Sequence, residues 1–228
     1  MSEKNIPNYP SSSDQFKNKN IVITAAAGSG IGYATAKRYL EEGGNVFISD
    51  LHEDRLKACI KELQDLNLGR IDGCLCNVTS TKEVNEMILK ASDYLEAIDV
   101  LVNNAGLGGQ NRLEEMPDDV WNNIIDVTLN GTMRVMRASI PHLKKTKGVI
   151  VNNASVLGWR AQKDQTHYAA AKAGVMALTR CTAVELAEYN IRVNAVAPSL
   201  ALNPHLSKTS SDELINTLIN KEVLGRAA

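Results

Sequence analysis

A serine, a tyrosine and a lysine are the residues of this chain best placed to carry chemistry. Ser155 stands thirteen residues before Tyr168, and Lys172 follows the tyrosine by four. The alanine-rich run 168–177 favours a helix, and residues four apart share a helical face, so the phenol and the ammonium should point the same way. Ser155 follows the β-branched run 148–153, which predicts a buried strand whose carboxyl end faces a ligand crevice. We therefore expect all three groups to converge.

This trio suits proton transfer to or from an alcohol oxygen while a hydride moves between the alcohol carbon and a cofactor. A phenol is a useful base near neutral pH only if its pKa falls well below its ordinary value of about 10. A close ammonium in a partly dry cleft can supply much of that change, and an oxidised nicotinamide ring would supply more. The alternative is a solvent-facing tyrosine and lysine pair, and the remaining motifs decide against it.

Ser155 and the Tyr168-x-x-x-Lys172 spacing resemble the signature of the classical short-chain dehydrogenase/reductases. The resemblance implies an NAD(P)-dependent oxidoreductase that acts on a secondary alcohol or ketone, with these three residues catalytic. The overall pattern is similar to that of reductases of 3-oxoacyl thioesters, and the segment after Pro198 resembles members that act on ring-bearing acids from steroid breakdown. The competing class is a nucleotide-binding module without catalysis. Inactive relatives usually lose the tyrosine or the lysine, so we expect an enzyme.

The composition is that of an ordinary globular chain, with 228 residues, a net charge of −1 and 44% hydrophobic residues. A net charge near zero does not indicate binding to nucleic acid or to an anionic membrane. The sequence has no apolar run of about 18 residues and no secretion leader, so we expect a cytoplasmic protein. Cys74 and Cys76 have no cluster of histidines nearby, which indicates buried free thiols and no metal site.

Short apolar runs alternate with helical patterns along the chain. Two long helices should occupy about 117–145 and 166–189. Residues 1–18 are polar, contain two prolines and should form a flexible N-terminal arm. Six strands with intervening helices predict an α/β fold, namely a single Rossmann-like domain over 19–228 with a doubly wound parallel sheet and helices on both faces. The expected strands lie at 20–24, 45–50, 71–76, 98–102, 148–153 and 191–197.

A glycine-rich turn follows the first strand and opens a helix. Glycine permits a tight turn and lets helix-terminal amides approach a pyrophosphate, which the helix dipole also favours. The alternative is a plain strand-to-helix turn. The candidate cofactor contacts in this turn are Gly28, Ser29, Gly30, Ile31 and Gly32.

The turn departs from the family pattern Thr-Gly-x-x-x-Gly-x-Gly. Aligning the last Gly-x-Gly with residues 30–32 puts Ala25 and Ala26 at the opening Thr-Gly. Because alanine has a Cβ atom, Ala26 should avoid a glycine-only conformation, and Gly28 should take up the strain. We expect a dinucleotide to bind nevertheless.

Asp50 closes the second strand, eighteen residues after Gly32. An acidic side chain there can accept hydrogen bonds from both adenosine ribose hydroxyls and would repel a 2′-phosphate. Neither Ser29 nor Leu51 is basic, although relatives that use NADP often carry a basic residue at these positions. We therefore expect NAD as the cofactor. The alternative is a surface aspartate, with another residue setting the preference.

Asparagine-containing turns follow the third and fourth strands. The sequence Asn-Asn-Ala-Gly at 103–106 matches a family motif that supports the central sheet and lines the adenosine side. Asn77 stands where the family usually has the aspartate of an Asp-Val pair that contacts adenine. Loop capping by asparagine can coexist with these roles. The implied cofactor contacts are Asn77, Val78, Asn104, Ala105 and Gly106.

Two further departures lie near the expected chemistry. Many members carry an asparagine in the central helix that holds a water linking the catalytic lysine to solvent, but Thr128 takes that place here. Asn130 is about 200° further round the helix and cannot replace it, which puts the proton relay in doubt. After the sixth strand, Pro198 is present, and Asn203 stands where a threonine usually fixes the carboxamide of nicotinamide. The resemblance therefore implies that Pro198 and Asn203 contact the cofactor.

Substrate specificity should come from residues 158–165 and from the segment after the sixth strand, which would close over the crevice. Ser210 and Glu213 have the spacing of a capping box, which predicts a lid helix. Trp159 would either form one wall of a hydrophobic substrate pocket or pack on the protein surface. His167, beside the catalytic tyrosine, is expected at the rim.

The family normally continues beyond the last residue of this chain, through a further helix and a seventh strand. The seventh strand would pair with the sixth, so the run 191–197 is expected to be an unprotected sheet edge. The resemblance implies a homotetramer for the full-length protein. We expect the 228-residue chain to form dimers or aggregates by itself.

Overall fold

The computed structural model of the protein describes residues 7–202 and 212–227, in which six parallel strands form one sheet. The strand order is β3-β2-β1-β4-β5-β6, which is the doubly wound order expected from the sequence. Each strand corresponds to one of the predicted runs. The strands are β1 (Asn20–Thr24), β2 (Asn45–Asp50), β3 (Ile71–Leu75), β4 (Val100–Asn103), β5 (Val149–Asn153) and β6 (Arg192–Val196).

Helices occupy the connections between the strands. The first long predicted helix is confirmed as α4 and α5, which are joined through a π-helical turn, and the second as α6 followed by a 3₁₀ turn. The longer helices are α1 (Ile31–Glu41), α2 (Glu53–Asp65), α3 (Thr81–Leu95), α4 (Asp118–Ile125), α5 (Gly131–Thr146), α6 (Thr166–Leu186) and α8 (Asp212–Asn220). The short turns are η1 (Leu113–Glu115), η2 (Asp126–Asn130), η3 (Val156–Gly158) and η4 (Ala187–Tyr189).

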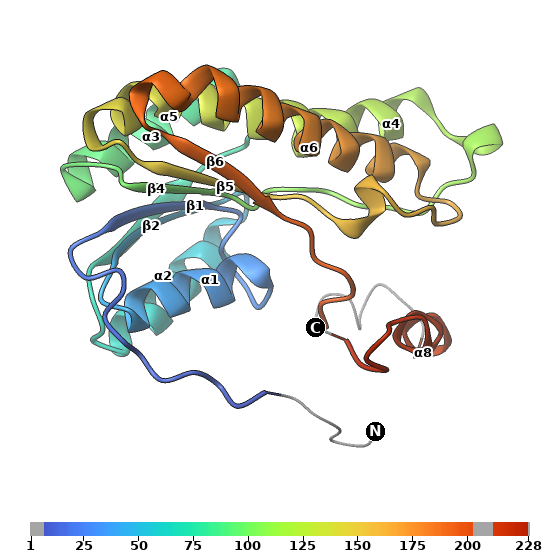
Figure 1. Cartoon of the computed structure of the whole chain (residues 1–228), viewed down its shortest axis with the longest axis horizontal. Coiled ribbons are helices and arrows are strands. Elements are labelled where there is room, and N and C mark those ends of the chain that lie inside the picture. Colours follow the sequence, from blue (N-terminus) through green and yellow to red (C-terminus); the bar gives the residue numbers. More distant parts are fainter. Residues whose placement is uncertain (1–6, 203–211, 228) are drawn as a thin grey trace.

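The sheet separates two layers of helices. Figure 1 shows α3, α4, α5 and α6 on one face, and α1 and α2 on the other. Successive strand residues point to opposite faces, so each strand feeds both cores. Val22 and Leu101 pack in the core with α3 and α5, whereas Ile21 and Ile23 pack in the core with α1 and α2. The predicted architecture of a parallel sheet with helices on both faces is confirmed.

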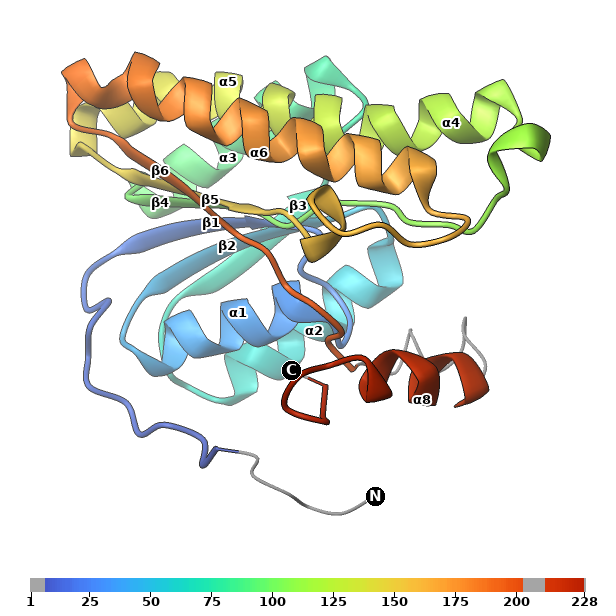
Figure 2. The ribbon, with the colours of Figure 1, turned by 45° about the vertical axis from the view of Figure 1, so that its right-hand side comes forward.

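Within the described residues, β6 is an edge strand, as the sequence predicts. Four of its five residues are exposed, and only Val193 is buried. After β6 the chain leaves the sheet and leads toward α8, which lies beyond the carboxyl ends of the strands (Figure 2). The sixth strand therefore presents unpaired backbone to solvent, and its continuation approaches the edge of the sheet where ligands bind in folds of this kind.

The segment from residue 7 to residue 18 contains no helix or strand but contacts the end of α1. The Glu42 carboxylate accepts hydrogen bonds from the backbone N–H groups of Ser13 at 2.9 Å and Gln15 at 3.2 Å. These bonds are the main reason that the pKa of Glu42 lies below its ordinary value. Arg38 donates to the Pro10 carbonyl at 2.7 Å. These polar contacts thus hold this segment against the end of α1 before the first strand.

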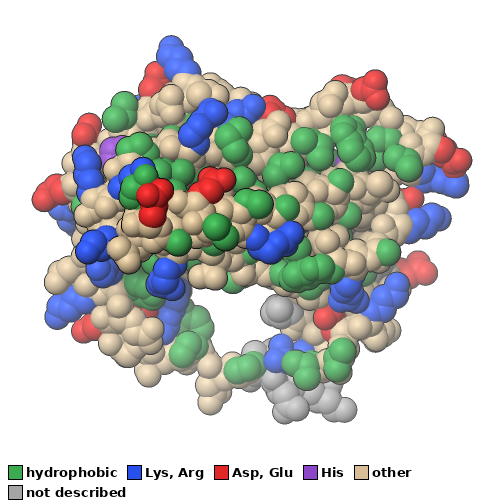
Figure 3. All heavy atoms as spheres, turned by 45° about the horizontal axis from the view of Figure 1, so that its top comes forward, with side chains coloured by type: hydrophobic (Ala, Val, Ile, Leu, Met, Phe, Trp, Pro, Cys, Tyr) green, Lys and Arg blue, Asp and Glu red, His purple; other side chains and the backbone are tan. Residues whose placement is uncertain are grey.

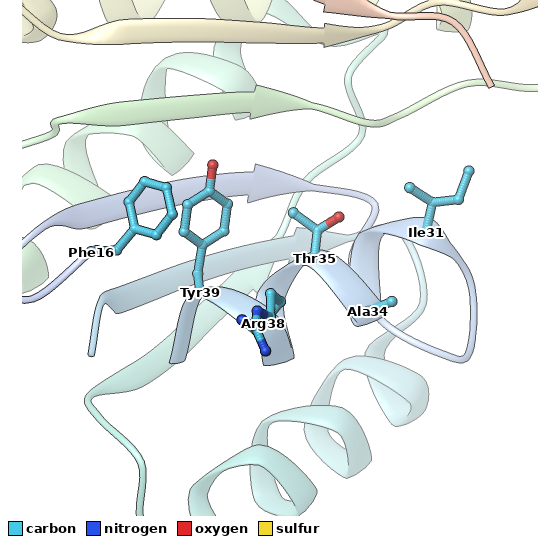
Figure 4. A pocket seen from close by; sticks show the side chains of 6 residues that line it. All are labelled: Phe16, Ile31, Ala34, Thr35, Arg38 and Tyr39. Atoms are coloured by element: carbon cyan, nitrogen blue, oxygen red, sulfur yellow. The ribbon is translucent and has the colours of Figure 1, made fainter. Parts of the chain in front are cut away.

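An apolar hollow of about 370 Å³ runs along α1. Phe16 meets Tyr39 edge-on, with ring centroids 4.6 Å apart, and Figure 4 shows both rings along one side of the helix with Ile31 at its far end. None of the residues of the expected trio lines this hollow, and the Tyr39 ring points from α1 toward the sheet, beside the Phe16 ring (Figure 4).

Gly73 in β3 lies close against Ile48 of the paired strand β2. A Cβ atom there would lie 2.3 Å from the Ile48 carbonyl oxygen and 2.9 Å from Ile48 Cγ1. Gly73→Ala must therefore shift one of two paired strands, and we expect its unfolding free energy to fall by about 1 to 3 kcal/mol in urea denaturation. Gly30→Ala, whose Cβ meets nothing within 4 Å, is the control and should change stability by about 0.5 kcal/mol or less. Equal losses for both variants would contradict this packing.

Candidate active site

Ser155, Tyr168 and Lys172 converge at the carboxyl end of the sheet. Ser155 follows β5 and caps η3, where its hydroxyl accepts a hydrogen bond from the Leu157 N–H at 3.2 Å. Tyr168 and Lys172 lie in the first two turns of α6. The Ser155 side chain hydrogen-bonds to the Tyr168 phenol, an interaction that lowers the pKa of the phenol. The predicted convergence of hydroxyl, phenol and ammonium is therefore present.

The Lys172 ammonium is almost completely buried, with 3% of the residue exposed. It donates a hydrogen bond to the backbone carbonyl of Asn153, at the end of β5, and lies 5.6 Å from the centre of the Tyr168 ring. A Cβ atom on Gly106 would come within 3.4 Å of Nζ, so the turn after β4 closes over the ammonium. Burial lowers the pKa of Lys172 from 10.5 to about 8, because a charged amine loses its hydration there.

The pKa of the Tyr168 phenol differs from the expectation. Burial raises this pKa above its ordinary value, and the hydrogen bond to Ser155 offsets only part of the increase. The ammonium of Lys172 lies over the Tyr168 ring and donates its hydrogen bond to the backbone carbonyl of Asn153, not to the phenol oxygen. The predicted lowering of the phenol pKa by lysine is thus wrong for the protein by itself. The phenol is protonated at neutral pH, which suits an acid that donates to a developing alkoxide.

Thr128 lies in the π-helical turn η2, at the position where the family carries a relay asparagine. Its hydroxyl accepts from the Leu107 N–H at 3.0 Å and donates to the Leu107 carbonyl at 3.2 Å. Asn130 donates instead to Asp126 at 3.0 Å, so it does not replace Thr128, as the sequence predicts. The threonine hydroxyl therefore fixes the turn after β4 that covers the lysine.

The glycine-rich turn between β1 and α1 has the shape of a phosphate cradle. Gly28 has φ +109°, a conformation that favours glycine, and Ala26 avoids the left-handed region as predicted. Ala25 takes a left-handed φ of +50° instead. Gly30 caps α1, and a Cβ atom on Gly28 or Gly30 would meet nothing within 4 Å. The free amides of the helix start therefore face open space, which fits a pyrophosphate.

Gly32 has a different role from the other glycines, because it lies against the neighbouring backbone. A Cβ atom there would lie 2.6 Å from both the Ala25 carbonyl oxygen and Asn104 Nδ2. Ser29 and Ile31 are exposed between these glycines. The turn thus combines a close helix contact at one end with an open surface at the other.

The Asp50 carboxylate is held in a fixed orientation at the end of β2. It accepts hydrogen bonds from the backbone N–H groups of Ala27 at 3.2 Å and His52 at 3.1 Å. Burial raises the pKa of Asp50, and the nearby Arg55 guanidinium, 3.6 Å away, opposes that rise. Arg55 lies in the first turns of α2, outside the positions at which the sequence led us to look for a basic residue. The residues fit an adenosine ribose, with a cation beside it.

The turn after β4 is fastened to both neighbouring strands by asparagine side chains. Asn104 donates to the carbonyls of Thr24 at 3.2 Å and Ala25 at 2.9 Å and accepts from Asn153 at 2.9 Å. The Thr24 hydroxyl accepts from the N–H groups of Asn104 and Ala105, both at 3.0 Å. The expected role of this motif in supporting the central sheet is confirmed. The hydrogen bonds that the Thr24 hydroxyl makes to this turn were not predicted from the sequence.

The turn after β3 shows the expected capping by asparagine. Asn77 accepts hydrogen bonds from the Thr79 N–H at 3.0 Å and the Thr79 hydroxyl at 2.9 Å. Val78 is buried in the core next to Gly131. Pro198 lies after β6, where its carbonyl accepts from the Val156 N–H at 3.1 Å. Asn203, and Ser210 of the predicted capping box, lie outside the described residues.

His167 is completely buried, so its predicted place at the rim is wrong. Neither ring nitrogen has a geometrically good hydrogen-bond partner among the described residues, and a Cβ atom on Gly109 would lie 3.4 Å from Nε2. Burial lowers the pKa of His167, which a weak contact with the Gln165 backbone only partly opposes. A neutral imidazole therefore packs beneath the loop that passes over Tyr168. Its position on the inner face of α6 follows from the tertiary packing and leaves no signal in the sequence.

A cleft of about 530 Å³ opens above Ser155 and Tyr168. One wall is the segment after η3, and the opposite wall is α8 together with the residues that follow it, as expected for a lid. Trp159 is 74% exposed and does not line the cleft, which favours the surface alternative for this residue. The cleft is lined by Gln110, Ser155, Val156, Leu157, Arg160, Ala161, Gln162, Lys163, Asp164, Tyr168, Ser199, Leu200, Thr217, Leu218, Lys221 and Glu222.

The described part of the chain contains no group of three or more histidine, cysteine and carboxylate side chains that could hold a metal ion. Cys74 and Cys76 pack with the same core, although Cys74 is only partly buried. None of the helices in residues 7–202 and 212–227 is long and apolar enough to cross a membrane.

Residues 19–214 match the family model of the short chain dehydrogenases. The chain is 54% identical, over 92% of its length and 81% of the relative, to the (5R,7aS)-5-hydroxy-7a-methyl-1-oxo-2,3,5,6,7,7a-hexahydro-1H-indene-carboxyl-CoA reductase of Mycobacterium tuberculosis. It is 38% identical, over 93% of its length and 85% of the relative, to the 3-oxoacyl-[acyl-carrier-protein] reductase FabG of Thermotoga maritima. A crystal structure of a variant of the actinorhodin polyketide ketoreductase with NADPH has a TM-score of 0.85 at 30% identity and covers 95% of this chain and 87% of that one.

The sheet order, the cradle after β1 and the trio at the end of β5 and the start of α6 define a dinucleotide-dependent oxidoreductase. The chain belongs to the short-chain dehydrogenase family. The predicted enzyme class is confirmed, and the non-catalytic alternative falls away.

The buried ammonium makes stability depend on pH. The pKa of Lys172 is about 8 in the folded protein against 10.5 ordinarily, so the unfolded chain binds more protons between these values and the unfolding free energy rises with pH across this window. Lys172→Met should remove that rise and, at pH 7, increase the unfolding free energy by about 1 to 3 kcal/mol. Urea denaturation from pH 7 to pH 10.5 measures both effects. A variant that is less stable at pH 7 and keeps the rise would contradict the burial cost.

Proposed function

We propose that this protein uses NAD(P)H to reduce the ketone of a hydrophobic acyl thioester to a secondary alcohol. The observation that carries the proposal is the Tyr168 phenol, which is hydrogen-bonded to Ser155 and lines a partly apolar cleft together with it. The similarity to reductases of 3-oxoacyl thioesters and of a ring-bearing carboxyl-CoA supports a thioester substrate. The chain is 54% identical to the ring-bearing carboxyl-CoA reductase and 38% identical to the 3-oxoacyl reductase. This difference favours a ring-bearing acyl group over a simple acyl chain.

The residues of the trio divide the work in this reaction. Ser155 and Tyr168 both face the cleft, where their hydroxyls would bind the ketone oxygen and Tyr168 would donate its proton as negative charge develops there. Lys172 stabilises the phenolate that remains. The cofactor supplies the hydride, and its pyrophosphate would lie at the start of α1, with its ribose at Asp50. These residues hold the reacting groups in one crevice, which contributes to the rate by orientation.

Removing the Tyr168 hydroxyl tests the acid directly. Tyr168→Phe should lower turnover of a panel of acetoacetyl-CoA and ring-bearing ketoacyl-CoA thioesters by about 100-fold or more, measured as loss of NAD(P)H absorbance. NADH binding and the melting temperature should persist. Tyr189→Phe, at the exposed turn after α6, is the matched control and should keep full activity. A Tyr168→Phe enzyme with more than about a tenth of the wild-type rate would exclude Tyr168 as the acid.

We further propose NAD as the preferred cofactor. The Asp50 carboxylate, oriented by two backbone N–H groups, suits the two ribose hydroxyls and repels a 2′-phosphate. Arg55 weakens that repulsion because it lies 3.6 Å from the carboxylate, and one similar solved structure, a ketoreductase, contains NADPH.

Variants of Asp50 and Arg55 should therefore move the cofactor preference in opposite directions. Asp50→Ala should lower the NADH over NADPH ratio of kcat/KM by about tenfold, equivalent to about 1.4 kcal/mol. Arg55→Ala, the paired control, should raise this ratio. A wild-type enzyme that already prefers NADPH would overturn the proposed role of Asp50.

A homotetramer is the assembly we propose for the full-length protein, and the cytoplasm its location. The outer face of α6 supports association, since Ala170, Ala173, Ala177, Cys181 and Val184 follow one another at helical spacing and none of them is buried. Figure 3 shows hydrophobic side chains spread over this helical layer. A helix that is apolar on both its inner and outer faces is typical of a buried position.

A further inference from the structure

Three positive side chains line the cleft that contains the catalytic phenol. Arg160 and Lys163 come from the segment after η3, and Lys221 comes from the turn after α8. Only two carboxylates, Asp164 and Glu222, share the cleft. The two walls thus carry cations that face one opening, and a hydride transfer to a ketone needs none of them.

Only one of these cations has an ion-pair partner in the described part of the chain. Arg160 Nη1 lies 3.7 Å from Glu222 Oε1, and the Arg160 side chain is 51% exposed. This is a long, partly hydrated contact, of the kind that contributes little to stability. Lys163 and Lys221 form no ion pair with any described residue.

Glu222 is held in its place from the other side. Its Oε1 atom accepts a hydrogen bond from the Ser199 hydroxyl, in the segment that follows β6. The Arg160 to Glu222 contact therefore joins the two walls of the cleft. A stronger anion that enters the opening can take Arg160 from Glu222 while the serine still satisfies the carboxylate.

We propose that Arg160, Lys163 and Lys221 bind the phosphate groups of the thioester's carrier, so that the substrate is a phosphorylated pantetheine thioester. Guanidinium and ammonium groups are the natural partners of phosphate oxygens. The apolar lining by Val156, Leu157, Leu200 and Leu218 would receive the acyl and pantetheine portions. This inference rests on the proposed reduction of a thioester at the same site. The shared chemistry fits both coenzyme A and the phosphopantetheine arm of a carrier protein.

Steady-state kinetics with three acetoacetyl thioesters test the proposal, namely those of coenzyme A, 4′-phosphopantetheine and pantetheine. The double variant Arg160→Ala/Lys163→Ala should raise KM for the coenzyme A thioester about tenfold more than KM for the pantetheine thioester, with kcat little changed. Glu222→Gln should lower KM for the phosphorylated thioesters, because it removes the competing carboxylate. Lys61→Ala, on the exposed surface of α2, controls for a general loss of positive charge.

The three thioesters distinguish the source of the phosphate. A selective effect on both phosphorylated thioesters assigns the pantetheine phosphate, and an effect on the coenzyme A thioester alone assigns the phosphates of its nucleotide. Equal KM changes for all three thioesters would overturn the proposal.

Calorimetric binding of free coenzyme A and of pantetheine keeps the inference separate from the proposed reaction. If the wild-type enzyme reduces none of the thioesters, the proposed function fails. Coenzyme A that binds more tightly than pantetheine, with the difference lost in the double variant, would still support the phosphate site. Equal binding of the two ligands would overturn it.

Discussion

The buried ammonium of Lys172 is the interaction on which the site depends. A charged amine removed from water needs compensating contacts, and the carbonyl at the end of β5 provides one. That carbonyl points to the lysine only while β5 ends where it does, beside β4 and β6. The reduced pKa of Lys172 is the remaining cost. The catalytic cation therefore requires the sheet to terminate at a fixed place.

Side-chain amides and hydroxyls secure that end of the sheet. Asn103 donates to Asn152 at 2.8 Å, and Asn152 donates in turn to Thr179 of α6 at 2.9 Å. Asn104 and Asn153 link β1, β4 and β5 in the same way. Buried polar groups that are paired can fix one arrangement of a core. The cofactor crevice and the lysine are therefore positioned by two adjacent sets of side-chain hydrogen bonds at the ends of three central strands.

The sequence predicts the strands, the long helices and the convergence of the trio, because periodic apolar patterns and short spacings are local properties. It does not predict the pKa of Tyr168, since that pKa depends on how deeply α6 packs. The burial of His167 and the approach of Arg55 to Asp50 likewise depend on the packing of helices against other elements. The contact between Arg160 and Glu222 joins segments 62 residues apart. No local pattern marks such a pair.

The central claim is that the Tyr168 phenol is a protonated acid in the protein by itself. Carbon-13 NMR titration of tyrosine-labelled enzyme, with Tyr168→Phe to assign the signal, measures its pKa directly. We expect a pKa above the ordinary value of 10.0, because burial outweighs the hydrogen bond from Ser155. A pKa below that of free tyrosine would show that the ammonium of Lys172 already dominates the phenol and would contradict this account.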